Sequence, residues 1–173
     1  MLPELDALQR SAYFDTYLEH LVSDDLAAEL IRSSKELEAL ISPLSGEQME
    51  FRYAPEKWSV RQVVQHLIDT ELIFNYRALR IGREVAPQKL DGFDENEYAN
   101  RADLSNLTNS ELLEFFTSTR QSTCYLAKTF SEAQLERVGI ASGHRIQVKA
   151  LFYITAGHAL HHANVIRERY LQA

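Results

Sequence analysis

Apolar residues recur every three to four positions through four long segments of the chain, which span residues 24–42, 60–82, 109–130 and 148–170. This spacing places the apolar side chains of each segment on one face of an α-helix. Four amphipathic helices of similar length can bury these faces against one another. The pattern therefore predicts an all-α protein built on a four-helix bundle.

Helix-start signals support the same division. A Ser or Thr followed three residues later by Glu or Gln marks a capped helix N-terminus. This pairing occurs at Ser59, Thr108 and Ser131, the last of which precedes a brief helix. Ser23 is the expected cap of the first long helix, and Ser45 is expected to begin a short helical turn.

The connections between the segments are unequal. Residues 83–106, which include Pro87, show no clear period and are expected to form a long crossover with room for a short helical turn. A short extended stretch around 145–148 is expected to lead into the fourth helix. No repeat or low-complexity linker divides the sequence, so residues 1–173 are expected to form a single domain.

Charge and composition narrow the classes of function. The 173 residues include 18 Lys and Arg against 25 Asp and Glu, a net charge of −7 that disfavours binding to nucleic acid. No apolar run approaches the ~20 residues of a membrane span, and no signal-like segment opens the chain. Cys124 is the only cysteine, which fits a reduced, partly buried thiol in a cytoplasmic protein. A core of this size is expected to fold without a metal.

Two histidines carry most of the candidate chemistry. His158 and His162 are four residues apart, so both lie on the apolar face of the fourth helix. Each imidazole brings polar nitrogens into the core, and their lost hydration must be compensated. Separate hydrogen bonds to core neighbours would compensate them, and so would one shared cation. Spacing alone does not choose between these two readings.

A third histidine favours the cation. His66 lies near the edge of the apolar face of the second helix, where it could face the fourth helix. Three neutral imidazoles would bind a divalent metal and leave coordination positions open for chemistry or for a ligand. Of the other histidines, His161 is expected at the margin of the apolar face, His144 in a loop and His20 in the N-terminal segment.

Acid–base candidates are few. Glu71 falls on the apolar face of the second helix, where it could pair with a buried Arg or orient an imidazole. Glu71 and His161 are therefore the candidates for a general acid or base. Acidic residues at 91, 94 and 95 are expected to form an exposed acidic loop, although they could overhang the bundle.

Two arginines are candidates for binding a co-substrate. Arg77 and Arg80 could hold a carboxylate of a low-molecular-weight thiol. The alternative, which we weigh as the commoner one, is that both pair with Glu or Asp at the surface or between helices.

Several motifs together resemble the DinB-like superfamily, the damage-inducible, YfiT-type proteins. They are RYAPEKWSVRQVVQHLIDTE at 52–71, YRALR at 76–80, GFDEN at 92–96 and AGHALHH at 156–162. The similarity covers nearly the whole chain from about Ser23 onward. Glu56 stands where a Gly is common in the family, which changes a loop and none of the metal ligands.

The resemblance implies an up-down-down-up four-helix bundle with a long crossover, and a divalent metal held by His66, His158 and His162. The metal would be Zn, Ni, Fe or Mn. Members include thiol S-transferases that use bacillithiol, mycothiol or glutathione, so a transferase or a hydrolase acting on a small electrophile is expected. The resemblance also implies a homodimer. A metal-bound thiol or water would be the nucleophile, so no residue of the protein need attack covalently. A non-enzymatic metal- or ligand-binding stress-response protein is the alternative.

Overall fold

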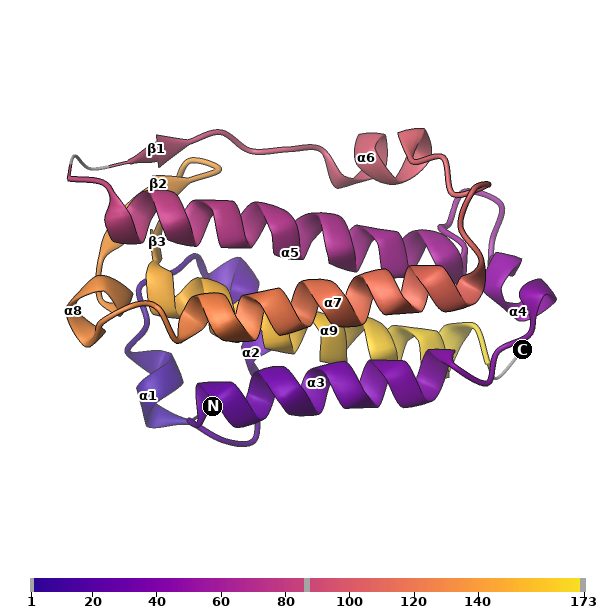
Figure 1. Ribbon diagram of the computed structural model, residues 1–173, viewed down its shortest axis with the longest axis horizontal. Coiled ribbons are helices and arrows are strands. Elements are labelled where there is room, and N and C mark those ends of the chain that lie inside the picture. Colours follow the sequence, from indigo (N-terminus) through magenta and orange to yellow (C-terminus); the bar gives the residue numbers. More distant parts are fainter. Residues whose placement is uncertain (1, 86–87, 172–173) are drawn as a thin grey trace.

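Four long helices pack side by side in the computed structural model, which describes residues 2–85 and 88–171 (Figure 1). The long helices are α3 (Leu26–Ile41), α5 (Val60–Arg83), α7 (Asn109–Ala127) and α9 (Val148–Arg169). Helices α3 and α9 run in one direction, and α5 and α7 run in the other (Figure 1). The main packing pairs are α3 with α9, α5 with α7 and α5 with α9. The expected up-down-down-up bundle is confirmed.

Most of the predicted helix starts are confirmed. Ser59, Thr108 and Ser131 each form a complete capping box, with hydrogen bonds in both directions. The same motif at Ser45 begins α4 (Gly46–Glu50). Ser131 begins the short helix α8 (Glu132–Leu135).

The cap of the first long helix differs from the prediction. Asp25 is the N-cap of α3, and its Oδ1 accepts a hydrogen bond from the Ala28 amide at 3.0 Å. Ser23 instead accepts from the Asp25 amide at 3.0 Å, so its side chain supports the cap from two residues upstream. Both residue types favour a cap position, and the pattern alone could not choose between them.

The crossover returns along the length of the bundle from the end of α5 to the start of α7 (Figure 1). It contains β1 (Lys89–Leu90) and α6 (Glu95–Arg101), a full helix where only a turn was expected. Asp94 caps α6 by accepting from two backbone amides. Pro87 lies outside the described residues.

A small sheet adds to the predicted all-α architecture. Strands β2 (Val138–Ala141) and β3 (His144–Gln147) form an antiparallel hairpin, and β1 pairs with β2 in parallel. The two turn residues, Ser142 and Gly143, have positive φ values of 52° and 79°, as a tight hairpin turn requires. Strands this short leave no readable period in the sequence. His144, expected in a loop, is the first residue of β3.

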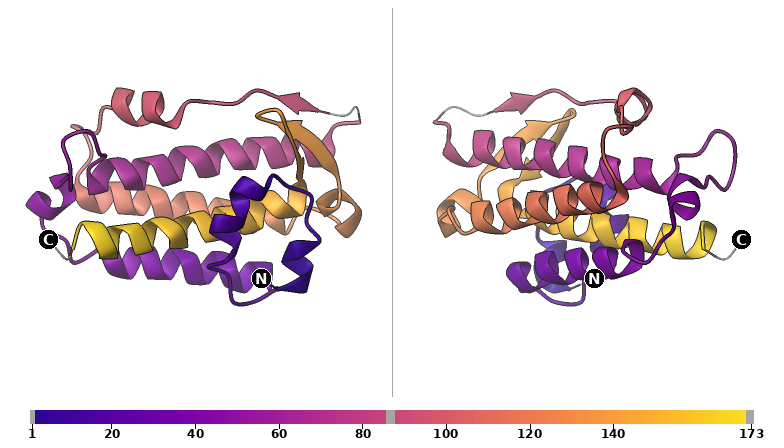
Figure 2. Two further views of the ribbon diagram at one scale, coloured as in Figure 1. Left: turned by 180° about the vertical axis from the view of Figure 1, so that it is seen from behind. Right: turned by 45° about the vertical axis from the view of Figure 1, so that its right-hand side comes forward.

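The N-terminal segment folds back against α9 (Figure 2). It contains α1 (Pro3–Asp6), the 3₁₀ turn η1 (Ala12–Phe14) and α2 (Asp15–Leu18). Because α9 is covered from several sides, every residue from 150 to 160 is buried. Among the described residues, no helix has both the length and the apolarity needed to cross a bilayer.

Gly157 allows this close packing. A Cβ at position 157 would collide with the backbone carbonyl of Tyr17, which lies directly against α9. The contact brings the Tyr17 side chain next to His158, with ring centroids 4.9 Å apart. The N-terminal segment therefore reaches the interior face of α9 only because residue 157 has no side chain.

We expect Gly157→Ala to lower the free energy of unfolding by about 1–3 kcal/mol, because the added methyl forces the backbone of the N-terminal segment away from α9. Chemical denaturation of wild type and variant measures the loss. Gly46→Ala is the matched control, since a Cβ there meets no atom within 4 Å. Equal losses in the two variants would contradict the proposed contact.

Candidate metal centre

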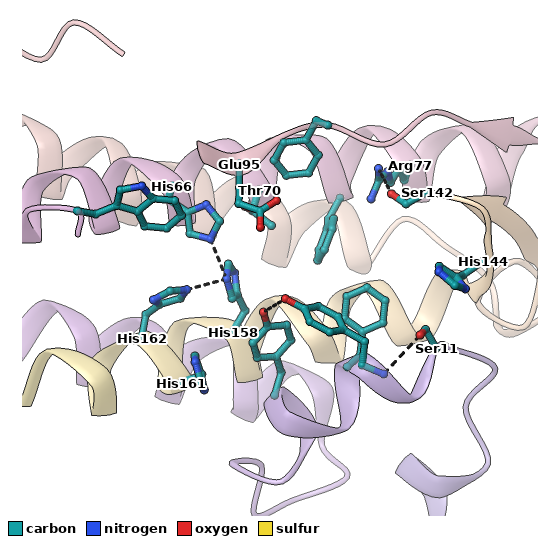
Figure 3. A pocket seen from close by; sticks show the side chains of 16 residues that line it. Ser11, His66, Thr70, Arg77, Glu95, Ser142, His144, His158, His161 and His162 are labelled. Atoms are coloured by element: carbon teal, nitrogen blue, oxygen red, sulfur yellow. Dashed lines mark hydrogen bonds between the residues drawn. The ribbon is translucent and has the colours of Figure 1, made fainter. Parts of the chain in front are cut away.

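Three imidazoles converge between α5 and α9 (Figure 3). The Nε2 atom of His158 lies 3.1 Å from Nε2 of His66 and 3.0 Å from Nε2 of His162. One ligand atom from each of the three residues lies within 4.8 Å of the others. The structure therefore brings together the three histidines that the sequence singled out.

The positions of the rings follow from helix geometry and from aromatic neighbours. His158 and His162 occupy successive turns of α9, and His66 faces them from the adjacent α5. The Trp58 ring packs 4.7 Å from the His66 ring, and Tyr17 covers His158 from the opposite side. His66 is 8% exposed and His158 is 5% exposed. The ligand atoms are thus held in place by packing.

The imidazoles are neutral at physiological pH. Burial lowers the pKa of His66 to about 4. Burial also lowers the pKa of His158 and of His162 well below the ordinary value, and the neighbouring imidazoles add to the effect. Neutral imidazole is the form that ligates a metal, because its unprotonated nitrogen carries a free lone pair.

The donor set fits a divalent cation better than mutual hydrogen bonding. A neutral imidazole nitrogen either donates one proton or offers one lone pair, so the central His158 Nε2 cannot bond well to both neighbours. Ligand nitrogens at ~2.1 Å from one ion lie roughly 3.0–3.4 Å apart, depending on coordination geometry. The two Nε2 separations, 3.1 and 3.0 Å, lie at the lower end of this range. The three-histidine cluster thus indicates a divalent metal.

The cluster opens into a pocket of about 520 Å³. Thr70, Phe74 and Arg77 line it along α5, and the crossover contributes Phe93 and Glu95. Further lining residues come from the N-terminal segment and the hairpin: Ser11, Tyr13, Phe14, Tyr17, Ser142 and His144. A ligand in this pocket could reach the imidazoles and touch four separate segments of the chain.

Glu71 serves as the partner of a buried arginine. Its carboxylate accepts from Arg120 Nε at 2.8 Å and from Arg120 Nη2 at 2.9 Å, and Thr123 also donates to it. Of the two roles considered for Glu71, pairing with Arg is confirmed. Glu71 does not line the main pocket, so a direct acid–base role stays a prediction without support from its position.

The two candidate arginines have different surroundings. Arg80 pairs with Glu84 and also donates to Tyr76 and Gln88, so the surface-pairing alternative is confirmed for it. Arg77 is buried and lines the pocket. It donates hydrogen bonds to the Asp91 carbonyl and to the Ser142 hydroxyl, and no acidic side chain of the described residues pairs with it.

His161, Cys124 and Glu95 lie in the surroundings that the sequence predicted. His161 is half-buried at the pocket wall, with its ring 5.3 Å from that of Tyr17, which agrees with its expected marginal position. Cys124 is partly buried, and burial raises its thiol pKa, as expected for an unreactive cysteine. Glu95 is exposed as expected, yet it also lines the pocket.

Sequence reasoning missed most of the remaining pocket wall. Phe93 lies within the GFDEN motif, which was the available signal for the crossover. Glu95 of the same motif was expected either in an exposed loop or over the bundle. Tyr13 and Tyr17 are four residues apart and could have been read as one helical face. Nothing in the sequence pattern pointed to Ser142, because its place depends on a two-residue turn.

Comparison with known proteins agrees with this geometry. The sequence pattern of the DinB superfamily matches residues 29–166, which include all three histidines. The chain belongs to the DinB superfamily.

Two curated relatives carry related names. A protein of Geobacillus thermodenitrificans named "Putative metal-dependent hydrolase" is 28% identical over 129 residues, covering 73% of this chain and 71% of the relative. A similarly named protein of Oceanobacillus iheyensis is 25% identical over 124 residues, covering 72% and 71%. Both names describe the relatives and agree with a metal-dependent function for this DinB protein.

A solved structure shares the fold. YfiT from Bacillus subtilis, described as "a probable metal-dependent hydrolase with an unusual four-helix bundle topology", superimposes with a TM-score of 0.76. It is 20% identical, and the match covers 88% of this chain and 90% of the YfiT chain. At this identity the likeness establishes the four-helix fold of the DinB protein.

We expect Arg120→Met to lower the free energy of unfolding by about 3–5 kcal/mol, because it leaves the Glu71 carboxylate buried without its partner. Denaturation at neutral pH measures the loss, and Arg120→Met combined with Glu71→Leu should recover more than half of it. Arg101→Met is the matched control, since the Arg101 side chain is 79% exposed and pairs, among the described residues, with Glu97 alone. Wild-type stability in Arg120→Met would contradict this account.

In metal-free protein, stability should fall as the pH drops from 6.5 toward 4. Unfolded histidines take up protons near pH 6.5, whereas the folded-state pKa of His66 is about 4, so acid favours the unfolded chain in this window. The contribution of neutral His66 to the free energy of unfolding is therefore fully present above pH 6.5. Denaturation across this range should show that the free energy of unfolding depends less steeply on pH in His66→Phe than in the wild type. An unchanged slope in His66→Phe would refute the assignment.

Proposed function

We propose that this protein is a metal-dependent hydrolase acting on a small molecule, with the ion held by His66, His158 and His162. The observation that carries the proposal is the convergence of three neutral imidazoles on the wall of an open pocket. When bound, a divalent ion with open positions supplies Lewis acidity and activates water near neutral pH. The relatives named as hydrolases support the same reaction class.

The residues of the chain position and shield the reacting groups. Trp58 and Tyr17 pack on the imidazoles and keep bulk water from two sides of the cluster. Burial raises the pKa of Tyr17 above its ordinary value, so its phenol stays protonated and can donate a hydrogen bond to a substrate. Tyr13, whose hydroxyl lies 3.0 Å from that of Tyr17, fixes the orientation of the phenol.

Glu95 is the proposed proton acceptor. Its carboxylate lines the pocket from the crossover, and Figure 3 shows it pointing inward beside Thr70. Unlike Glu71, it is not occupied by a buried arginine. An exposed carboxylate in this place can take a proton from water that attacks the substrate and pass it to the leaving group.

A thiol S-transferase is the second candidate function. The same ion would lower the pKa of a thiol as it does that of water, and a low-molecular-weight thiol would then be a co-substrate. Cys124 does not line the pocket, so the thiol would have to come from outside the chain. Arg77 could hold a carboxylate of such a thiol, as the sequence suggested.

Other properties stay predictions. We place the protein in the cytoplasm as a homodimer, on the family resemblance and on the charge and cysteine content of the sequence. The expected metal is Zn, Ni, Fe or Mn. Neutral imidazoles suit the first three, and cellular supply often selects the ion. A non-enzymatic protein that holds a metal and a ligand remains the alternative to the enzyme.

Purified protein should contain about one divalent ion per chain and hydrolyse one or more members of an ester and amide panel. His162→Ala should lose most of the metal and the turnover, because only two imidazoles remain. Elemental analysis and product detection measure the two effects, and His144→Ala is the control for metal content.

Each alternative has its own outcome in this experiment. Conjugation of bacillithiol or glutathione to a bimane electrophile, without hydrolysis, would replace the hydrolase by the transferase. Bound metal with neither reaction would favour the binding protein. A protein that takes up no divalent ion would overturn the proposal.

A further inference from the structure

We propose that the end of the pocket away from the imidazoles is an anion-binding subsite built on Arg77. The substrate would then carry a carboxylate or a phosphate at a distance from the bond that reacts. The position of the reacting bond rests on the proposed function above. The binding of an anion at Arg77 does not, since it depends on the surroundings of this guanidinium alone.

Arg77 is a buried cation without an acidic partner. The described residues include three buried arginines, Arg61, Arg77 and Arg120. Arg61 pairs with Glu50 and Arg120 pairs with Glu71, whereas no carboxylate of the described residues lies within ion-pair distance of Arg77. Buried charges are ordinarily paired, because an unpaired charge loses its hydration without compensation. An anionic ligand would supply the missing partner.

The hydrogen bonds of Arg77 leave donors for such a ligand. Its Nη2 donates to the Asp91 carbonyl at 2.9 Å and to the Ser142 hydroxyl at 3.0 Å. Both acceptors are neutral, and they use only part of the five N–H groups of a guanidinium. Arg77 is 5% exposed and is one of the residues that line the pocket (Figure 3). A planar carboxylate or a phosphate fits this fork of donors.

Two aromatic rings hold the guanidinium. Its central carbon lies 5.7 Å from the Phe74 ring centroid and 5.9 Å from that of Phe93. The rings restrict the orientation of the side chain and surround it with apolar groups. Burial in these surroundings lowers the pKa of Arg77, which is the signature of a charge that lacks compensation. An arriving anion would be attracted more strongly here than at an exposed arginine.

The hairpin turn contributes to the same subsite. Ser142 has a φ of 52°, a left-handed conformation that residues other than Gly adopt infrequently. In this conformation its hydroxyl reaches Arg77, and Gly92 of the crossover lies beside the Ser142 side chain. Segments from α5, the crossover and the hairpin thus meet at one guanidinium.

The distance between His66 and Arg77 on α5 determines the shape of the substrate that could reach both ends of the pocket. His66 and Arg77 are eleven residues apart, about three turns, so they lie on nearly the same face roughly 16 Å apart along the helix axis. Thr70 and Phe74 line the pocket between them. The expected substrate is therefore elongated, with an anionic group at one end, an apolar or aromatic middle, and a hydrolysable bond at the other end.

Hydroxamates with a second functional group test this arrangement in metal-loaded protein. A hydroxamate chelates the ion, so monohydroxamates of linear dicarboxylic acids of graded length, roughly eight to fourteen carbons, probe the separation between the ion and Arg77, whose backbone lies ~16 Å from that of His66 along α5. At the best length, calorimetry should show the carboxylate compound binding about tenfold to a hundredfold tighter than the alkyl hydroxamate of equal length. Hydroxamates of the same length that end in a phosphate monoester show, by comparison, whether the subsite prefers a phosphate or a carboxylate.

Variants assign the preference to Arg77. Arg77→Met keeps the apolar contacts with the two rings and should remove the preference, whereas Arg77→Lys should keep part of it. Arg80→Met is the matched control, because Arg80 lies one turn away on α5 and outside the pocket lining. A preference that persists in Arg77→Met, or one lost equally in Arg80→Met, would overturn the proposal. The wild-type comparison alone suffices if Arg77→Met does not fold: no preference at any length refutes the subsite.

Metal-free protein separates this proposal from the proposed function. Phenylbutyrate, which has no metal-binding hydroxamate, should bind to the metal-free wild-type chain more tightly than phenylbutanol, and Arg77→Met should abolish the difference. If hydroxamates fail to bind metal-treated protein while phenylbutyrate binds through Arg77, the metal centre fails and the anion subsite stands. If hydroxamates bind and neither anion is preferred in either form of the protein, the subsite fails and the metal centre stands.

Discussion

The close approach of three uncharged imidazoles is the constraint on which the site depends. A helical core tolerates buried polar nitrogens only when something replaces the water that they lose. Here the three Nε2 atoms face one another, and proton sharing among them cannot satisfy all three. A shared cation can, and it gains ligands that are already neutral and already held by packing. Burial therefore favours metal binding, because it keeps the imidazoles neutral and holds them close together.

The surrounding bundle makes this arrangement rigid. Behind His158, Arg120 joins Glu71 of α5 to backbone carbonyls of α3 and α9, so one side chain connects all four long helices. Such a buried ion pair adds little net stability compared with apolar packing, but it strongly penalises any shift that would separate the partners. We infer that it fixes the relative position of α5 and α9, and hence the distance between His66 and the two histidines on α9.

Helical periodicity in the sequence predicted the long helices and the faces on which their residues lie. It could not predict contacts between residues that are far apart in the sequence. The apolar face of α5 and the capping box at Ser59 predicted this helix. The four-residue spacing of His158 and His162 predicted that both lie on one face of α9. The roles of Arg77 and Arg80 could not be separated in this way, because both lie on α5 and only the crossover and hairpin decide which one is buried. Likewise, His144 and Ser142 join the pocket through a two-residue turn whose position no helical period reveals.

This division between regular and irregular segments has a functional consequence. The three histidines of the cluster lie on α5 and α9, inside the region that matches the superfamily pattern, residues 29–166. One wall of the pocket, with Tyr13 and Tyr17, comes from the N-terminal segment before that region. Its contact with α9 depends on Gly157, next to His158 of the cluster. A shared metal centre can thus serve different substrates when the irregular segments that complete the pocket differ, and we infer that the selectivity of this chain lies in those segments.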